Sequence, residues 1–265
     1  MEEWRFINSG PGTASFNMAV DEAIAQSVRK VQSPPTLRIY EWTTPSVSIG
    51  CFQKVNCTNL SRCLTMGIPL VRRLTGGRAI LHGHELTYSF SATTAHGPFS
   101  YGLRDSYKKI GRAFCRAISA LGLSPEAETG RERGREGNTI KNPLCFHSTS
   151  FGEITLDSRK VCGSAQKRWR EGFLQQGSIP YTIDEEAVRQ IFNIAPSVNL
   201  KERMIGLQEV IPALSHEQLR ETIKASFEET FQTTFIPAAL SQEELLLARE
   251  LETRRYLSAE WNFQR

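Results

Sequence analysis

Strand-like and helix-like patterns divide this chain into two unequal parts. In the first two thirds, short apolar runs alternate with turn residues, and Glu85–Ser91 alternates polar and apolar residues as a half-buried strand does. In the last third, apolar residues recur at helical spacing over residues 184–193, 215–230 and 241–255. This distribution predicts an α+β fold, with a mixed, mostly antiparallel sheet and packed helices. We expect one domain over residues 1–182 and a helical C-terminal extension packed on it over residues 183–265.

The other elements follow from the same periodicities. Further strands are expected over residues 4–8, 37–40, 47–49, 69–74, 79–81, 151–156, 160–162 and 173–178. Helices are expected over residues 56–66 and 105–121, and over residues 15–30 with Ser15 as the N-cap. Asp157-Ser158-Arg159 predicts a hairpin turn, and the polar, Gly-rich segment 124–141 predicts a mobile loop.

The composition is that of an ordinary globular protein. Hydrophobic residues make up 40% of the 265 residues and charged residues 23%, which excludes a disordered chain. No stretch of 18 apolar residues predicts a membrane span, and the acidic N-terminus lacks the features of a secretory signal. We therefore expect a cytoplasmic protein whose six cysteines are reduced thiols.

The charge is unevenly distributed. Residues 1–199 carry 24 basic and 17 acidic side chains, a formal +7, whereas residues 200–265 carry 8 basic and 11 acidic ones, a formal −3. Basic residues cluster in three runs, over residues 72–78, 131–141 and 159–170. Such a field favours an acidic partner. Nucleic acid is not expected, because the basic runs lack interleaved aromatic residues and the sequence contains no known nucleic-acid-binding motif.

Residues 72–78 form a candidate binding loop, Arg72-Arg73-Leu74-Thr75-Gly76-Gly77-Arg78. Two glycines after a strand let backbone N–H groups approach a ligand, and Arg73 can pair with a phosphate or a carboxylate. The loop could cradle a phosphopantetheine, a nucleotide or an acyl carbonyl. A tight hairpin turn with surface arginines explains the same residues equally simply. A P-loop is excluded, because its lysine and serine or threonine are missing.

Two histidines on one expected strand raise the possibility of a metal site. His82 and His84 would share a strand face, a spacing compatible with zinc. No neighbouring cluster of ligands supports this interpretation, so we expect no metal. His82 could instead form a hydrogen bond with a ligand or with the neighbouring loop.

Cys145 is the candidate nucleophile. It follows the charged segment, and Lys160 comes fifteen residues later, on an adjacent strand of the expected sheet. A nearby cation lowers the pKa of a thiol and favours the reactive thiolate. The alternative is that Cys145 is a buried, inert thiol, as most cysteines are. Cys162 competes for the same role only if the strand is regular between it and Lys160.

Three segments together resemble the biotin/lipoate protein ligase-like acyltransferases. They are residues 72–82 with Glu85-Leu86-Thr87-Tyr88-Ser89, the segment Arg159–Gln166, and Cys145-Phe146 ahead of Glu153-Ile154. The last of these is similar to the nucleophile segment of the octanoyltransferase branch, the LipM type. Smaller similarities lie at Asn17–Glu22 and at Tyr256–Phe263.

The resemblance implies a cofactor-attachment enzyme in which residues 1–182 form the acyltransferase catalytic domain. Such an enzyme takes octanoyl from octanoyl-acyl carrier protein and delivers it to a lysine of a lipoyl domain, such as the glycine cleavage H protein. Cys145 would accept the acyl group and Lys160 would contact its carbonyl. The residues that would bind the substrate are Arg73, Gly76, Gly77, His82, Gly163, Ser164 and Ala165. No cofactor is implied, because a thioester donor needs no ATP. Both protein partners are usually acidic, which fits the +7 charge.

Three other functions stay open. An ATP-dependent lipoate–protein ligase shares the glycine and lysine segments but needs no nucleophilic cysteine. An amidotransferase would move octanoyl or lipoyl between proteins, also through a cysteine. A non-catalytic acyl-protein-binding module would need neither ATP nor a nucleophilic cysteine.

Overall fold

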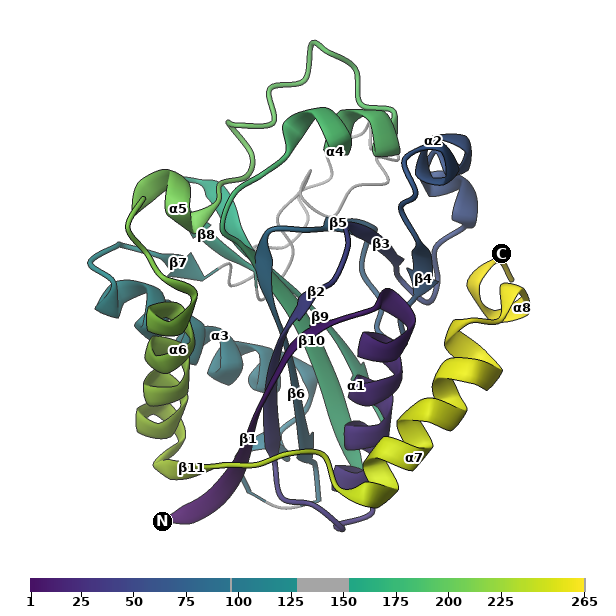
Figure 1. Ribbon diagram of the computed structural model, residues 1–265. Helices are drawn as coiled ribbons and strands as arrows, with labels where there is room; N and C mark the ends of the chain where they lie inside the picture. Colours follow the sequence, from purple (N-terminus) through teal and green to yellow (C-terminus); the bar gives the residue numbers. More distant parts are fainter. Residues whose placement is uncertain (96, 128–152, 265) are drawn as a thin grey trace.

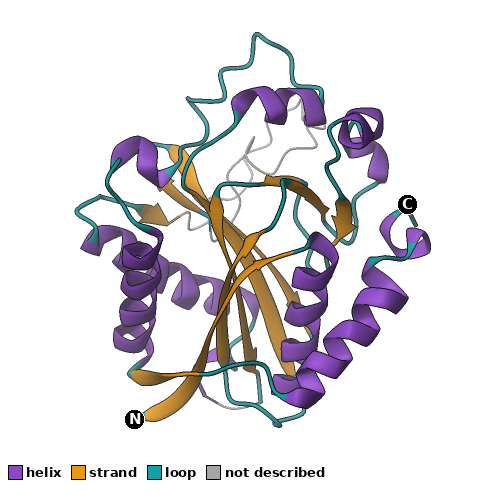
Figure 2. Ribbon diagram, in the orientation of Figure 1, coloured by secondary structure: helices purple, strands orange, loops and turns teal. Residues whose placement is uncertain are grey.

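The computed structural model describes residues 1–95, 97–127 and 153–264. A large sheet runs through the centre of the molecule with helices on both faces (Figures 1 and 2). Its strand order is β11-β1-β2-β6-β10-β9-β8-β7, where β1 pairs in parallel with β11 and β2 and the other pairs are antiparallel. The expected mixed, mostly antiparallel sheet is confirmed. The strands are β1 (Glu2–Gly12), β2 (Thr36–Trp42), β6 (Glu85–Thr93), β7 (Glu126–Ala127), β8 (Ile154–Leu156), β9 (Arg159–Arg168), β10 (Gly172–Pro180) and β11 (Thr233–Pro237).

A second, three-stranded sheet lies beside the upper part of the large one (Figure 1). It has the order β4-β3-β5, with β3 (Ser46–Ile49), β4 (Leu70–Arg72) and β5 (Ile80–His82). Helices α2 (Leu60–Thr65) and α4 (Glu185–Phe192) contribute to the apolar cluster that packs against it. Several strand boundaries differ from the prediction. The strand β1 extends over Glu2–Gly12 rather than residues 4–8, β4 ends at Arg72 rather than residue 74, and β9 continues from residue 162 to Arg168.

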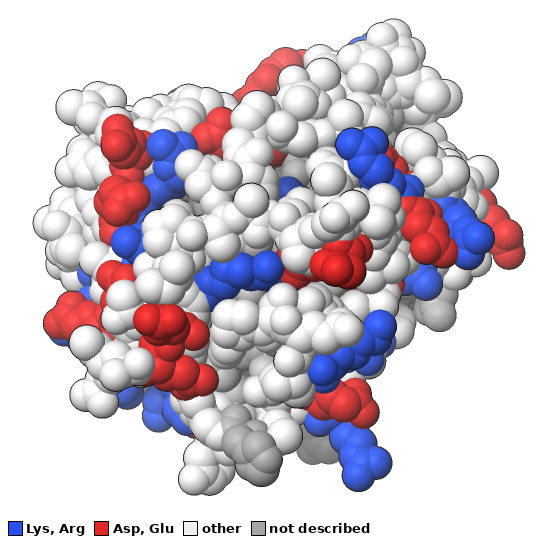
Figure 3. All heavy atoms as spheres, turned by 60° about the horizontal axis from the view of Figure 1, so that its bottom comes forward, with Lys and Arg blue, Asp and Glu red and all other residues white. Residues whose placement is uncertain are grey.

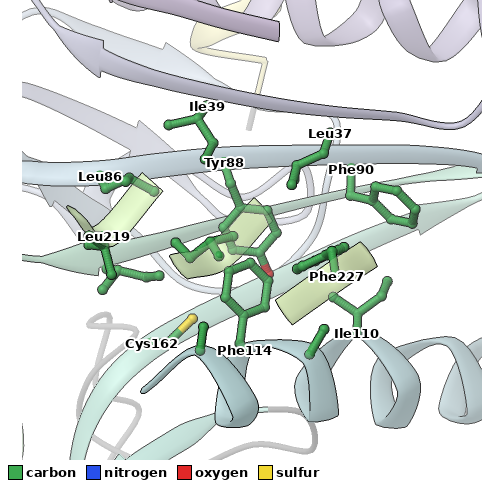
Figure 4. Close-up of a cluster of buried hydrophobic side chains, with 14 of the residues drawn as sticks. Leu37, Ile39, Leu86, Tyr88, Phe90, Ile110, Phe114, Cys162, Leu219 and Phe227 are labelled. Atoms are coloured by element: carbon green, nitrogen blue, oxygen red, sulfur yellow. The ribbon is translucent and has the colours of Figure 1, made fainter. Parts of the chain in front are cut away.

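Helices α3 (Leu103–Ala120) and α6 (His216–Phe231) cover one face of the large sheet. The main apolar core lies between these helices and the sheet. Alternation along β6 explains this core, because Leu86, Tyr88 and Phe90 all point to that face (Figure 4). The residues between them turn their hydroxyl groups to the opposite face, where Ser89 donates to Asp21. That face is covered by α1 (Ala14–Arg29) and α7 (Gln242–Leu251).

The helix predictions hold with shifted ends. The N-cap of α1 is Thr13, whose hydroxyl accepts from the Phe16 N–H, and not Ser15 as expected. Instead of one helix over residues 56–66, the structure has a 3₁₀ turn (Val55–Cys57) followed by α2. The hairpin at residues 157–159 is confirmed, and Asp157 and Ser158 both have the positive φ that such a two-residue turn requires.

Residues 183–265 contribute more than helices. The strand β11 within this segment joins the edge of the large sheet beside β1. The remaining elements of this segment are α5 (Leu207–Val210), a π-helical turn (Glu252–Tyr256) and α8 (Ala259–Asn262). Elsewhere in the chain, a 3₁₀ turn at Gly97–Phe99 precedes α3. Within the described ranges, no helix is long and apolar enough to cross a bilayer. Within the segment expected to be a loop over residues 124–141, Glu126 and Ala127 form the strand β7, because they pair with β8, and residues 128–141 lie outside the described residues.

Candidate active site

A narrow cavity lies between the large sheet and the small one. Met18 of α1 contributes to its wall, and Ser48, Ile80 and His82 come from the small sheet. The other lining residues are Tyr40, Trp42, Arg73, Thr87, Gly163, Ser164, Ala165, Gln176, Gly177 and Ser178. Rings, methyl groups and glycine backbone make up much of this wall. A narrow, largely apolar cavity of this kind suits an aliphatic chain.

Strand alternation decides how β9 meets the cavity. Ser164 turns its hydroxyl to the opposite face of the sheet, where it lies 2.7 Å from the Tyr88 hydroxyl. Gly163 and Ala165, its neighbours on the strand, therefore face the cavity. Ser164 contributes to the wall through its backbone. The three residues predicted from this segment thus all border the cavity, with Ser164 turned away.

Arg73 holds the glycine loop in place. Its guanidinium donates to the carbonyls of Gly76 and Arg78, each at 2.7 Å, and to the carbonyl and hydroxyl oxygens of Ser48, each at 3.0 Å. Arg73 is buried and lines the cavity. It therefore organises the loop rather than standing on the surface as the turn alternative assumed.

The two glycines of the loop lie beside the cavity rather than in its described lining. Gly77 has φ +83°, and a Cβ there would lie 3.3 Å from the Cβ of Ala165. Gly50 approaches the loop so closely that a Cβ at residue 50 would be 2.1 Å from the Gly77 carbonyl oxygen. Side chains at these positions would push the loop away from β9.

His82 is the centre of a buried polar network at the cavity wall. Its Nδ1 lies 2.6 Å from Glu85 Oε1 and its Nε2 lies 2.7 Å from Ser48 Oγ. The indole of Trp42 stacks on the imidazole with 4.0 Å between ring centroids, and its Nε1 donates to Thr87. Stacking and two hydrogen bonds fix the orientation of this ring.

Glu85 determines how the His82 ring is protonated. Burial on its own would raise the pKa of Glu85, but the charge of His82 and the hydrogen bonds from His82 and Thr87 outweigh it and lower this pKa. Glu85 is therefore a carboxylate at neutral pH and accepts the hydrogen of Nδ1. On the other side of the ring, Nε2 lies against the Ser48 hydroxyl, whose oxygen accepts from Arg73.

A second buried network supports the opposite wall. Asp21 of α1 forms an ion pair with Arg38 at 2.7 Å and accepts hydrogen bonds from the Tyr40 hydroxyl and from the Gln176 amide. Gln176 in turn accepts from Thr75 at 2.8 Å. The network connects α1, three strands and the glycine loop around the cavity. Asp21 and Thr75 lie in segments that the sequence analysis had noted, whereas Arg38, Tyr40 and Gln176 carry no local signal and join the network only in the fold.

Lys160 lies at the beginning of β9 and is 1% exposed. Its ammonium forms an ion pair with Glu153, which is also buried. Its backbone is fixed by hydrogen bonds with Arg203 and Ile205. Gly163 follows three residues later, about 10 Å along the strand at ~3.3 Å per residue. The strand that lines the cavity with Gly163 and Ala165 thus also carries a buried lysine.

The cysteines differ in their surroundings. Cys145 lies outside the described residues. Cys162 is fully buried in the core against α3 and α6, where burial raises the pKa of its thiol to about 12. Burial likewise raises the pKa of Cys115 to about 11. The strand register shifts between Lys160 and Cys162, so the regular alternation that would have placed both on one face is interrupted. Cys162 is a poor nucleophile at neutral pH.

The two histidines considered for zinc have separate environments. His82 is buried in its network, whereas His84 is exposed and lies 3.0 Å from the Thr182 hydroxyl. Among the side chains that the structure describes, no three His, Cys, Asp or Glu residues gather in a group that could hold a metal ion.

The mixed sheet, the glycine loop and the apolar cavity together define a catalytic domain of the lipoate-attachment type. The family model of the lipoyl protein ligase A/B catalytic domain matches residues 13–228. A crystal structure of lipoate-protein ligase A bound with ATP has the same fold, with a TM-score of 0.84, 24% sequence identity and 99% of each chain covered.

Curated relatives narrow this class. Octanoyltransferase LipM of Halalkalibacterium halodurans is 36% identical over 279 residues, and the alignment covers 100% of both chains. Octanoyltransferase LipM of Moorella thermoacetica is 36% identical over 270 residues, which cover 98% of this chain and 97% of that one. The chain belongs to the lipoyl protein ligase A/B family and, within it, to the LipM octanoyltransferases.

Proposed function

We propose that this enzyme transfers octanoyl from octanoyl-acyl carrier protein to a lysine of a lipoyl domain, such as the glycine cleavage H protein, through a thioester on Cys145. The observation that carries the proposal is the largely apolar cavity, which is lined by Gly163 and Ala165 of the same strand that carries the buried Lys160. An aliphatic tail gains about 0.8 kcal/mol for each methylene removed from water, so such a cavity selects an acyl chain. The lysine cation suits the polar carbonyl end.

The first half-reaction exchanges one thioester for another. The thiolate of Cys145 attacks the donor carbonyl, the new carbon–sulfur bond forms, and the bond to the carrier's phosphopantetheine sulfur breaks. The leaving sulfur takes up a proton. Lys160 is proposed to stabilise both the thiolate and the negative charge that develops on the carbonyl oxygen. Its partner Glu153 keeps it charged and oriented in spite of its burial.

The second half-reaction forms the amide. The neutral ε-amine of the acceptor lysine attacks the acyl-cysteine, the carbon–nitrogen bond forms, and the thiolate of Cys145 leaves. The amine loses one proton, which returns to the thiolate or passes to solvent. Neither half-reaction consumes ATP, because the donor is already a thioester. The scheme predicts ping-pong kinetics. A reactive thiol requires a reducing compartment, and we expect the reaction in the cytoplasm.

Acidic carriers are expected to bind near the cavity and Lys160, where the acyl group must enter. On the face that Figure 3 shows, basic and acidic side chains are interspersed. We therefore do not expect this face to capture an acidic partner by charge alone.

The proposal is tested by a transfer assay with purified octanoyl-acyl carrier protein and apo-lipoyl domain, with and without ATP. Transfer at equal rates in both conditions supports the proposal. Transfer of free octanoate that requires ATP would identify a ligase instead. If octanoyl-lipoyl domain replaces the carrier as donor at a higher rate, the enzyme is an amidotransferase. If the acyl group binds but never transfers, the chain is a binding module.

A further inference from the structure

The C-terminal segment ends against the strand that leads into the glycine loop. Among the residues that the structure describes, the strand β4 is an edge of the small sheet, and one side of Arg72 faces no neighbouring strand. Trp261 and Asn262 of α8 fill this place with side chains. The Trp261 indole donates to the Arg72 carbonyl at 2.8 Å, and the Asn262 side-chain oxygen accepts from the Arg72 N–H at 2.8 Å. Side chains thus replace a sheet partner at this residue.

The Arg72 side chain returns the contact. Its guanidinium donates to the backbone carbonyls of Trp261 and Asn262, at 3.1 and 3.0 Å, and to those of Gly50 and Gln53, at 3.0 and 2.7 Å. Arg72 is fully buried. One residue of β4 therefore connects the C-terminal segment with the loop that follows β3.

The same segment also holds α1. The Asn262 amide donates to the Tyr256 carbonyl at 2.8 Å, and the Tyr256 hydroxyl donates to Glu22 at 2.8 Å. Arg255 forms an ion pair with Glu22 at 2.5 Å and lies over the Trp261 ring. Glu22 is one helical turn after Met18, which lines the cavity.

We propose that Trp261 and Asn262 are positioning residues for the acyl cavity. They fix β4 and, through it, Arg73 and the glycine loop, while the contact with Glu22 fixes α1. Two walls of one cavity are thereby held by a segment that does not itself line it. This inference rests on the proposed function, because it assigns the affinity for the octanoyl donor to contacts of the C-terminal segment.

The test compares three variants of the full-length enzyme. Trp261→Phe keeps an aromatic ring and removes the donor to Arg72. Asn262→Leu removes the acceptor for the Arg72 N–H, whereas Asn262→Asp keeps it. Phe263→Ala is the control, because Phe263 directly follows α8 and its side chain is 48% exposed.

Two measurements are made on each variant. Hydrogen–deuterium exchange without substrate reports opening of residues 70–80, and steady-state kinetics report KM and kcat for octanoyl-acyl carrier protein. We expect Trp261→Phe and Asn262→Leu to speed the exchange of residues 70–80 by about tenfold, which corresponds to ~1.4 kcal/mol of local stability. KM should rise by a similar factor with a smaller change in kcat. Asn262→Asp should exchange more slowly than Asn262→Leu, and Phe263→Ala should match the wild type.

Unchanged exchange over residues 70–80 would overturn the proposal, as would faster exchange with an unchanged KM. An equal effect of Phe263→Ala would also overturn it. The exchange measurement needs no acyl transfer. A wild-type enzyme that transfers no octanoyl would therefore refute the proposed function, while the exchange data would still test the contact between the C-terminal segment and the loop.

Discussion

Replacing Ala165 by leucine tests whether the cavity holds the acyl chain. Ala165 follows Lys160 on β9, and its side chain lines the cavity that would receive the tail. Leucine adds three carbon atoms to this wall and displaces about three methylene groups of an octanoyl chain. At ~0.8 kcal/mol for each methylene, the loss is about 2.4 kcal/mol, or roughly 60-fold in affinity.

The assay measures kcat/KM for octanoyl and butanoyl carrier protein with the same acceptor. A butanoyl chain is four carbon atoms shorter and needs less of the cavity, so Ala165→Leu should lower the ratio of octanoyl to butanoyl activity. The expected decrease is about 60-fold, the factor that corresponds to the lost burial of three methylene groups. Ala225→Leu, on the exposed side of α6, is the matched control and should leave the ratio unchanged. An equal loss for both donors, or no loss for octanoyl, would refute the assignment of this cavity to the acyl tail.

Three further predictions concern charged and thiol groups. Lys160→Ala should lower octanoyl transfer by about 10²–10³-fold with an unchanged circular dichroism spectrum, whereas a near-normal rate would remove Lys160 from the mechanism. Glu85→Gln should lower Tm at pH 7 and have less effect near pH 3. The folded pKa of Glu85 lies below its ordinary value of about 4.3, so the carboxylate stabilises the fold above that pH and this stabilisation is lost as pH falls through the folded pKa. A Tm difference that grows toward pH 3 would contradict this. Iodoacetamide at pH 8 should leave Cys162 unmodified in the native protein and modify it in denaturant, because burial raises its pKa to about 12; rapid native modification would show that this thiol is accessible.

The elements with strong local signals were predictable. The strand β6 shows a clear alternation of polar and apolar residues. The helices α6 and α7 carry apolar residues at helical spacing, and each begins after a good N-cap, Ser215 and Ser241 respectively. β11 was missed, because Thr233–Pro237 is a short strand that ends in proline and lies between two helices. It forms only by pairing with β1 across more than 200 residues of chain, a contact that no local pattern encodes.

The candidate site shows the same division. Arg73, His82 and the glycines belong to one segment with unusual composition, so the sequence drew attention to them. Trp42, Ser48 and Gln176 have no such signal, because each is an ordinary residue of its own strand and meets the others only across the cavity. The α1 N-cap illustrates a smaller difference, since Thr13 and Ser15 are equally suitable residue types and only the path of the chain selects between them.

The most direct test of the account is the site of acylation. The enzyme is incubated with octanoyl-acyl carrier protein in the absence of ATP, and the acyl adduct is located by mass spectrometry of the intact protein and its peptides. The account predicts a single octanoyl group on Cys145 that hydroxylamine removes and that apo-lipoyl domain accepts. An adduct on Cys162, or an adduct that forms only when ATP is present, would contradict it.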